Sequence, residues 1–336
     1  MKNVSVIGAG SFGTALSIVL SRAGNRVKLW AREPEIAAAI NNHHRNPTYI
    51  PDVTLPESVV CHTDMAECLH RRDMIVFVTP SHAMREVARR VKPHLSGQEM
   101  IVSVAKGIEN DTFMTMSQVL DEVLDEVIVQ DHIGVISGPS HAEEVSKFRP
   151  TTVVSSSYSK RTAGIIQETF MTPMFRVYLN YDIMGVEIGG SVKNIMAIAA
   201  GIIDGAELGD NAKAALITRG LHEIKRLGMK LGASQDTFSG LTGVGDLIVT
   251  CTSEHSRNRY VGYHIGRGKT LDEIVNSMNM IAEGVRTTRS VHDWSRKLKI
   301  EMPITDAVYR VLFEQEDPKD VLYDLMTRDP KEEVVI

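Results

Sequence analysis

One lysine in this sequence lies in a nearly uncharged stretch, which makes it a candidate for acid–base chemistry. The stretch 185–203 carries two charged residues, Glu187 and Lys193, so as a helix it would be apolar nearly all round and buried. Burial lowers the pKa of a lysine, and such an ammonium can exchange a proton during carbonyl reduction. Small residues at helical spacing on its face would leave room for a ligand; they are Gly189, Gly190, Ala197 and Ala200. A lysine that reaches solvent from the helix edge is the alternative.

A glycine-rich turn near the N-terminus could hold a dinucleotide. Residues 8–13 read Gly-Ala-Gly-Ser-Phe-Gly, a G-x-G-x-x-G sequence between a strand-like run and a helical pattern. Gly8 would permit the tight turn, Gly10 would leave space for a pyrophosphate, and Gly13 would let the helix pack closely on its strand. The N–H groups of the helix N-terminus would then face the anion. A chance glycine turn is the alternative, but both flanks favour dinucleotide binding.

The end of the second predicted strand bears on which dinucleotide binds. The strand 27–30 is followed by Ala31, Arg32 and Glu33. An arginine here can pair with a 2′-phosphate and stack on adenine, so Arg32 favours NADP(H). Glu33 beside it leaves NAD(H) possible, because an acidic residue at this place binds the ribose hydroxyl. An exposed arginine without a ligand role is a further alternative.

Polar residues follow two other predicted strands. Lys106 comes after the run 101–104, and the segment 138–142, Gly-Pro-Ser-His-Ala, comes after the run 133–136. Ligands of doubly wound folds bind at the carboxyl ends of the strands. Both segments are therefore predicted to face one crevice.

Two later segments could bind or orient charged groups. The glycine-rich turn 243–246 ends on Asp246, which could orient an ammonium or bind a substrate hydroxyl, although capping a turn or helix is the more ordinary role. Ser256, Arg257 and Asn258 stand at a predicted helix start, where a hydroxyl, a guanidinium and an amide suit a phosphate or carboxylate. A solvated basic turn is the competing interpretation.

These residues need a sheet and a set of helices to position them. Strand-like runs and helical stretches alternate up to about residue 184, which predicts a parallel sheet with helices on both faces. The predicted strands are Val4–Ile7, Val27–Trp30, Met74–Val78, Met100–Val104, Ile133–Ile136, Thr152–Ser155 and Arg176–Tyr178. A helix is predicted over Thr14–Arg22, and a loop around Pro47, Pro51 and Pro56.

Long helical patterns replace the strands after residue 184. They are Val186–Ile203, Ala212–Leu227, Leu271–Met278, Arg286–Lys297 and Thr305–Leu312. We therefore predict an α/β fold in which a Rossmann-type doubly wound sheet, residues 1–184, precedes an all-helical domain, residues 185–336. The cleft between them is the expected ligand site.

Composition and charge limit the partners. The chain has 336 residues, 24% of them charged and 43% hydrophobic, as in ordinary soluble globular proteins. The net charge of −5 comes without long runs of one sign, so we expect a small-molecule partner, no nucleic acid and no stable membrane insertion. Cys61, Cys68 and Cys251 form no C-x-x-C pair, which favours a reducing compartment and a cytoplasmic protein. No metal-ligand spacing is present, so no metal is expected.

Taken together, these motifs resemble the bacterial family of NAD(P)+-dependent glycerol-3-phosphate dehydrogenases over nearly the full length. The motifs are GAGSFGTAL (8–16), AKG (105–107), SGPSHAEE (137–144), GGSVKNIMAIAAG (189–201), LTGVGDL (241–247), TSEHSRNR (252–259) and AEGVRTT (282–288). The resemblance implies a fold like that of 6-phosphogluconate dehydrogenase. It also implies reversible reduction of dihydroxyacetone phosphate to sn-glycerol 3-phosphate for phospholipid biosynthesis. A homodimer is expected, since the helical domain offers surface for one.

The resemblance also implies roles for individual residues. Lys193 would be the catalytic acid and base. The implied substrate contacts are Lys106, Gly138, Ser140, Lys193, Asp246, Ser256, Arg257 and Asn258. The implied cofactor contacts are Gly8, Gly10, Ser11, Phe12, Gly13, Arg32, Lys106, Ala142, Arg257, Ile281 and Glu283. The residue pattern alone gives no reason for Ile281 or Glu283.

The sequence departs from the family pattern at one place, and two other functions remain as alternatives. The family often has threonine and then an aromatic or apolar residue where this chain has Ser140 and His141, so a hydroxyl is retained. A reductase acting on another hydroxy acid or sugar phosphate is the nearest alternative, and Arg257 favours a phosphate. A dinucleotide-sensing module without turnover is the other, since fold alone does not establish catalysis.

Overall fold

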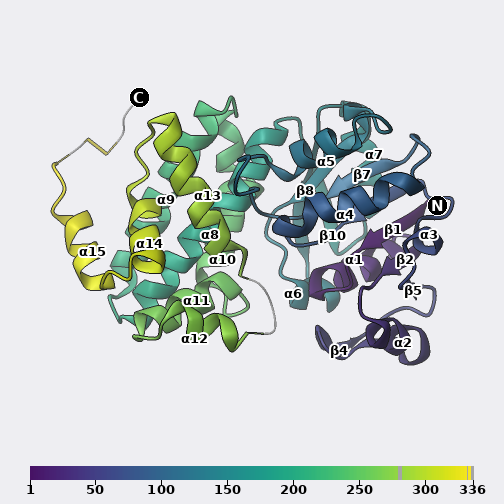
Figure 1. The fold of residues 1–336 in the computed structure, drawn as a ribbon, viewed down its shortest axis with the longest axis horizontal. Helices are drawn as coiled ribbons and strands as arrows, with labels where there is room; N and C mark the ends of the chain where they lie inside the picture. The colour runs from purple at the N-terminus through teal and green to yellow at the C-terminus, as the bar shows by residue number, and fades with distance from the viewer. Residues whose placement is uncertain (279–281, 331, 334–336) are drawn as a thin grey trace.

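The computed structural model describes residues 1–278, 282–330 and 332–333, and it has a sheet-containing half and a helical half (Figure 1). Eight strands form one sheet in the order β10-β9-β8-β7-β6-β1-β2-β5. They are β1 Asn3–Ile7, β2 Arg26–Trp30, β5 Val60–His62, β6 Met74–Phe77, β7 Met100–Ser103, β8 Ile133–Ser137, β9 Thr151–Ser157 and β10 Phe175–Asn180. All seven predicted strands are present.

Helices cover both faces of this sheet. They are α1 Ser11–Arg22, α2 Pro34–His43, α3 Met65–Leu69, α4 Met84–Val91, α5 Met116–Leu124, α6 Ala142–Ser146 and α7 Lys160–Phe170. Along β1, Val4 and Val6 enter one hydrophobic cluster and Ile7 enters another, because successive side chains of a strand point to opposite faces. The prediction of a doubly wound sheet is confirmed.

The prediction that the sheet is parallel throughout is wrong at one edge. β9 pairs antiparallel with β8, Gly134 lying opposite Ser157, and β10 then follows the direction of β9. The connection explains the reversal. α6 has five residues and spans about 7.5 Å, about half the length of a five-residue strand, so it does not carry the chain back to the opposite edge of the sheet.

The proline-containing segment predicted to be a loop contains strands. β3, Arg45–Asn46, and β4, Ile50–Thr54, form a two-stranded antiparallel ribbon beside the main sheet. Pro47 lies between the two strands, and Pro51 lies on a strand with an open edge, where a missing N–H is tolerated. The segment also leads into β5, which extends the main sheet beyond β2.

The second half of the chain is helical, as predicted. Its helices are α8 Ile183–Gly205, α9 Asp210–Lys230, α10 Asp246–Thr252, α11 Arg257–Gly266, α12 Leu271–Asn276, α13 Glu283–Leu298, α14 Pro303–Phe313 and α15 Pro318–Met326. α8 runs through the centre and packs against α9, α10, α11 and α13. By length and composition α8 resembles a membrane span, but that part of the helix is entirely buried among other elements of the protein.

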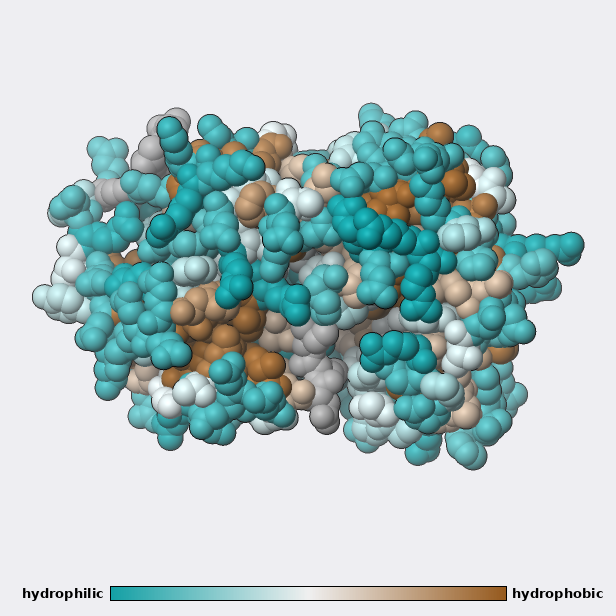
Figure 2. Space-filling model, in the orientation of Figure 1, coloured by the Kyte–Doolittle hydropathy of each residue, from teal (hydrophilic) through white to brown (hydrophobic). Residues whose placement is uncertain are grey.

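The two halves share apolar and polar contacts. Ile183 and Val186 of α8 pack against Val135 and Val154 of the sheet. The next residue of α8 is Glu187, whose buried carboxylate accepts hydrogen bonds from the backbone N–H (2.9 Å) and the hydroxyl (2.5 Å) of Ser117 in the first turn of α5. Burial raises the pKa of Glu187, and the hydrogen bonds from Ser117 oppose this rise only in part. The face of the molecule shown in Figure 2 is mostly hydrophilic.

Candidate active site

The glycine-rich turn joins β1 to α1 at the carboxyl edge of the sheet. Gly8 has a φ of +120°, which permits the turn. A Cβ on Gly13 would lie 1.8 Å from the carbonyl oxygen of Gly8, so the helix start and the turn are in backbone contact. A Cβ on Gly10 would meet nothing within 4 Å, and no side chain caps α1. The open space beside an uncapped helix N-terminus fits a dinucleotide pyrophosphate.

These two glycines give a matched pair of variants with opposite consequences. We expect Gly13→Ala to lower the free energy of unfolding by about 1–3 kcal/mol, because its methyl group overlaps the backbone of Gly8. Gly10→Ala should leave the melting temperature nearly unchanged and raise the Kd of the dinucleotide about tenfold, since the methyl group would occupy the phosphate approach. Thermal unfolding and cofactor titration of both variants measure this. Equal loss of stability in both would contradict it.

A buried asparagine that sequence reasoning missed supports the turn. Asn46 is fully buried, and its Nδ2 donates to the carbonyl oxygen of Ala9 (2.8 Å) and to Oγ1 of Thr14 (2.9 Å). The hydroxyl of Ser11 donates to the carbonyl oxygen of Tyr49 at 2.8 Å. Asn46 and Tyr49 therefore hold the turn, and their position beside prolines gave no sign of this contact.

Two lysines converge on one buried aspartate. Nζ of Lys193, on α8, lies 2.6 Å from Oδ1 of Asp246, and Nζ of Lys106, which follows β7, lies 2.8 Å from Oδ2. Lys106 also donates to the carbonyl oxygen of Gly138 at 2.7 Å, after β8. The cluster thus joins the carboxyl ends of two strands to two helices of the other half. The ordinary capping role considered for Asp246 is wrong, since its carboxylate is engaged by the ammonium groups.

Burial and charge shift both ends of this cluster. Lys193 is 5% exposed, and burial lowers its pKa to about 8, with Lys106 acting in the same direction and Asp246 opposing it. Burial alone would raise the pKa of Asp246, but the ammonium groups of Lys106 and Lys193 hold it below its ordinary value. A lysine that reaches solvent from the helix edge is therefore excluded. Lys193 can exchange a proton near neutral pH.

The reversed edge of the sheet explains how α8 delivers Lys193. Because β10 runs opposite to β8, α8 begins near the amino ends of the central strands and packs back across the sheet. The ten residues from Ile183 to Lys193 rise about 15 Å, close to the length of a five-residue strand. The lysine therefore reaches the carboxyl edge, where Lys106 and Gly138 lie.

The small residues of α8 serve packing, which corrects the expectation that they leave room for a ligand. A Cβ on Gly189 would lie 2.5 Å from the carbonyl oxygen of Thr242, and one on Gly190 would lie 2.5 Å from the hydroxyl of Ser137. Ala197 and Ala200 are fully buried. These residues bring α8 close to its neighbours, and that closeness places Lys193 within reach of Asp246.

Two further polar residues of the cluster were missed. The hydroxyl of Thr250, one turn after Asp246 on α10, lies 2.5 Å from Nζ of Lys193 and donates to the carbonyl oxygen of Asp246 at 2.6 Å. Nδ2 of Asn194 donates to the carbonyl oxygen of Lys106 at 3.1 Å. The spacing of Thr250 four residues after Asp246 would have put both on one helix face.

Some of the remaining expected substrate residues already make hydrogen bonds within the protein. The hydroxyl of Ser140 donates to the carbonyl oxygen of Gly138 at 2.9 Å. Ser256 is the N-cap of α11, as predicted, and accepts from the N–H of Arg259 at 3.2 Å. Oδ1 of Asn258 accepts from the N–H of Gly284 at 2.8 Å. Arg257 is exposed, and among the described residues it has no hydrogen-bond or ion-pair partner.

The expected cofactor residues beyond the glycine turn are more scattered. Arg32 is exposed and its Nη2 lies 2.7 Å from the carboxylate of Glu33. Phe12 is half-buried on α1, and Ala142 is the buried first residue of α6. Glu283 begins α13 and accepts hydrogen bonds from the N–H (3.0 Å) and hydroxyl of Ser81, across the two halves. Ile281 lies outside the described residues.

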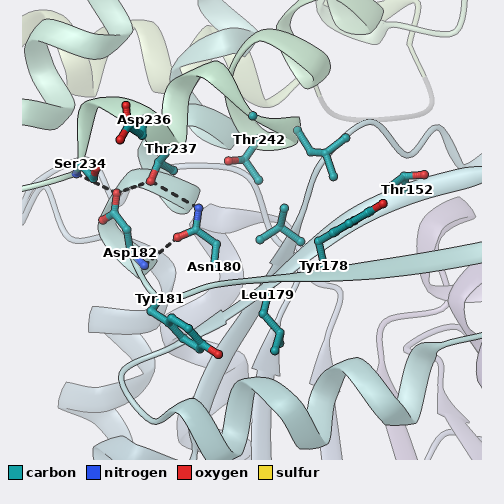
Figure 3. A pocket seen from close by; sticks show the side chains of 13 residues that line it. Thr152, Tyr178, Leu179, Asn180, Tyr181, Asp182, Ser234, Asp236, Thr237 and Thr242 are labelled. Carbon is teal, nitrogen blue, oxygen red and sulfur yellow. Dashed lines mark hydrogen bonds between the residues drawn. The ribbon is translucent and has the colours of Figure 1, made fainter.

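A separate cavity of about 840 Å³ lies against β9, β10 and the segment 234–242, and it contains none of the expected site residues. Figure 3 shows Asp182 at its wall, accepting hydrogen bonds from the N–H of Ser234 (2.9 Å) and the hydroxyl of Thr237 (2.7 Å). Asp182 also caps α8 through the N–H of Gly185. These bonds fix the start of α8, and the start of the helix determines where Lys193 lies along it.

A glycine turn for a dinucleotide, beside a buried lysine–carboxylate cluster and a helical second domain, is typical of two-domain dinucleotide-dependent oxidoreductases. The comparisons with known proteins narrow this class. Family models described as the N-terminus and the C-terminus of NAD-dependent glycerol-3-phosphate dehydrogenase match residues 3–163 and 182–323. The chain belongs to the NAD-dependent glycerol-3-phosphate dehydrogenase family, which confirms the resemblance of the motifs.

Individual relatives are similar to this chain over nearly its full length. The chain is 52% identical to a glycerol-3-phosphate dehydrogenase (NAD(P)+) of Salinibacter ruber over 333 residues, covering 99% of this chain and 97% of that one. It is also 52% identical to the enzyme of that name from Chlorobium limicola, with 99% of each chain covered. A crystal structure of glycerol-3-phosphate dehydrogenase from Coxiella burnetii is similar with a TM-score of 0.92 at 39% identity, covering 97% of this chain and 99% of that one.

Proposed function

We propose that this chain catalyses the reversible NAD(P)H-dependent reduction of dihydroxyacetone phosphate to sn-glycerol 3-phosphate. The observation that carries the proposal is the cluster of Lys193, Asp246 and Lys106 at the sheet edge that also holds the glycine turn. Membership of the family, whose relatives bear the name of this reaction, supports the substrate.

Lys193 acts as the acid and base. When bound, the reduced nicotinamide supplies the hydride to the ketone carbon. Lys193, with its pKa lowered to about 8, then donates a proton to the oxygen of that carbon, and it accepts the proton in the reverse direction. Asp246 holds Lys193 at 2.6 Å and Lys106 at 2.8 Å, so both ammonium groups are in place before the substrate arrives.

The phosphate is bound away from the reacting carbon. Arg257 is free to contact it at the start of α11, while Lys106, Gly138 and Ser140 line the other side. Binding energy from a remote phosphate can orient the carbonyl against the cofactor. The full set of proposed substrate contacts is Lys106, Gly138, Ser140, Lys193, Asp246, Ser256, Arg257 and Asn258.

We expect Arg257→Ala to raise the KM for dihydroxyacetone phosphate about 10- to 100-fold, because charge-assisted hydrogen bonds to the phosphate are lost. The melting temperature should not change, since Arg257 is exposed and unpaired among the described residues. Steady-state kinetics with Arg161→Ala, an exposed arginine on α7, as the control measure this. An unaltered KM would count against phosphate binding at this residue.

The preferred cofactor is NADPH in this proposal, with NADH as the weaker reductant. The guanidinium of Arg32 can turn from Glu33 to a 2′-phosphate, whereas Glu33 alone would favour the ribose hydroxyl. The proposed cofactor contacts are Gly8, Gly10, Ser11, Phe12, Gly13, Arg32, Lys106, Ala142, Arg257, Ile281 and Glu283. The ratio of kcat/KM for NADPH and NADH measures this preference.

The reaction itself is tested by the loss of NADPH absorbance after addition of dihydroxyacetone phosphate. Parallel assays use unphosphorylated dihydroxyacetone, a keto acid whose reduction gives a hydroxy acid, and a sugar phosphate. Oxidation that requires dihydroxyacetone phosphate supports the proposal. Oxidation with another ketone supports the alternative reductase, and cofactor binding without any oxidation supports a sensing module.

Several wider features belong to the same proposal. We propose a dinucleotide-binding domain over 1–184 and a substrate-binding domain over 185–336, which agrees with the family models ending at 163 and beginning at 182. We further propose a cytoplasmic homodimer that supplies glycerophospholipid synthesis. The buried, unpaired thiols of Cys61, Cys68 and Cys251 suit a reducing compartment.

A further inference from the structure

Two histidines face each other where the two halves meet. His141 follows β8 and is the N-cap of α6, while His255 precedes the start of α11. Their ring centroids are 6.0 Å apart with an angle of 59° between the planes. His141 stands between Ser140 and Ala142, and His255 directly precedes Ser256 and Arg257. The pair therefore links the strand ends to the segment proposed to bind phosphate.

One ring nitrogen of His141 is buried and makes no hydrogen bond to the described residues. Its Nε2 is shielded from solvent and has no hydrogen-bond partner among the described residues. A buried polar atom without a partner costs free energy, so such an atom in a site needs an explanation. The charged groups that act on the ring are Lys193, Lys106, Asp246 and Glu143. Three of these four belong to the lysine cluster or its counter-ion, so the ring lies beside the proposed reaction centre.

The ring of His141 is suited to donate a hydrogen bond as a neutral imidazole. Burial lowers the pKa of His141, and the ammonium groups of Lys193 and Lys106 lower it further, against a smaller opposing effect of Glu143 and Asp246. The imidazole is therefore neutral at pH 7, with one N–H and one unprotonated nitrogen. A neutral N–H donor binds an oxygen of a phosphate without adding a third positive charge beside the two lysines.

We propose that His141 is a specificity-determining residue whose Nε2 hydrogen-bonds a phosphate oxygen of the substrate, between Lys193 at the carbonyl and Arg257 at the far side of the phosphate. This inference rests on the proposed function, because it names a contact of the same substrate. His255 lies against the ring from the helical half. The aromatic or apolar residue that the family often has at this position would supply the packing but no N–H.

The test replaces the donor while keeping the ring. His141→Phe should raise the KM for dihydroxyacetone phosphate about tenfold, with kcat and the KM for NADPH changed less than twofold. His141→Gln keeps an N–H donor and should recover most of the affinity. His70→Phe, at an exposed histidine after α3, is the matched control and should behave as wild type. Melting temperatures of all four proteins establish that each is folded.

A second substrate separates a phosphate contact from a general effect on the site. With unphosphorylated dihydroxyacetone, kcat/KM should be the same for wild type and His141→Phe. An equal loss with both ketones, or an unchanged KM for dihydroxyacetone phosphate in a folded His141→Phe, would overturn the inference. A wild-type protein that oxidises no NADPH with dihydroxyacetone phosphate would instead refute the proposed function, so the two failures are distinguishable.

Discussion

Replacing Lys193 with alanine should lower kcat for reduction by about 10²- to 10⁴-fold, the usual contribution of a positioned proton donor. Its ammonium is buried, 2.6 Å from Asp246 and 2.5 Å from the hydroxyl of Thr250. The glycine turn and α1 are distant in sequence and separately held by Asn46, so the Kd for NADPH should change little. Single-turnover and steady-state assays of Lys193→Ala measure both quantities.

The pH dependence gives the same lysine a second signature. In the proposed mechanism reduction uses the protonated amine of Lys193, so wild-type kcat should fall as the pH rises through about 8, and the rate of the reverse oxidation should rise over the same range. This dependence should be absent from the residual activity of Lys193→Ala. The control is Lys230→Ala, at the exposed end of α9, which should keep both rate and profile. A folded Lys193→Ala protein with undiminished kcat would remove the assignment.

Asp246→Asn is expected to affect both stability and rate. The substitution leaves two ammonium groups beside a neutral amide in a buried site, and an uncompensated buried charge costs about 3–5 kcal/mol. Loss of the carboxylate also removes the interaction that opposes burial, so the pKa of Lys193 should fall further. The pH above which reduction declines should move to a lower value, with a lower kcat at pH 7.

A double variant makes this second prediction specific. Lys106→Met together with Asp246→Asn removes one of the two unpaired charges, so it should recover part of the stability lost by Asp246→Asn alone. Asp125→Asn, at an exposed carboxylate after α5, controls for charge change and should unfold like wild type. Denaturant unfolding and pH–rate profiles measure these effects. An unchanged decline of the rate with pH in Asp246→Asn would show that Asp246 does not set the pKa of Lys193.

Local patterns predicted much of this molecule. The G-x-G-x-x-G turn, the strands and the buried α8 each depend on residues close in sequence, so periodicity and glycine spacing were sufficient. Lys193 was found because a charge in an apolar helix is a local anomaly. The start of α11 was found from its capping residues for the same reason.

Contacts between residues that are far apart in the sequence could not be predicted from local patterns. Asp246 lies 140 residues from Lys106 and 53 from Lys193, and only the topology brings them together. The sequence analysis therefore favoured a capping role for Asp246 over a role as a counter-ion, because capping depends on neighbouring residues alone. The same reason applies to Asn46, which contacts the glycine turn from over 30 positions away. The reversal at β9 depended on the shortness of α6, which hydrophobic periodicity does not report.

The contact of Glu187 with α5 has a consequence for how the chain acquires its structure. The N–H of Ser117 in the first turn of α5 has its partner on α8, about 70 residues later, and the carboxylate of Glu187 has its donors on α5. A fragment that ends before α8 lacks Glu187, so the N–H of Ser117 loses this partner. We therefore expect the sheet-containing half and the helical half to unfold together, although each has its own hydrophobic core. On this expectation, the sheet-containing half reaches its full stability only after α8 has been synthesised.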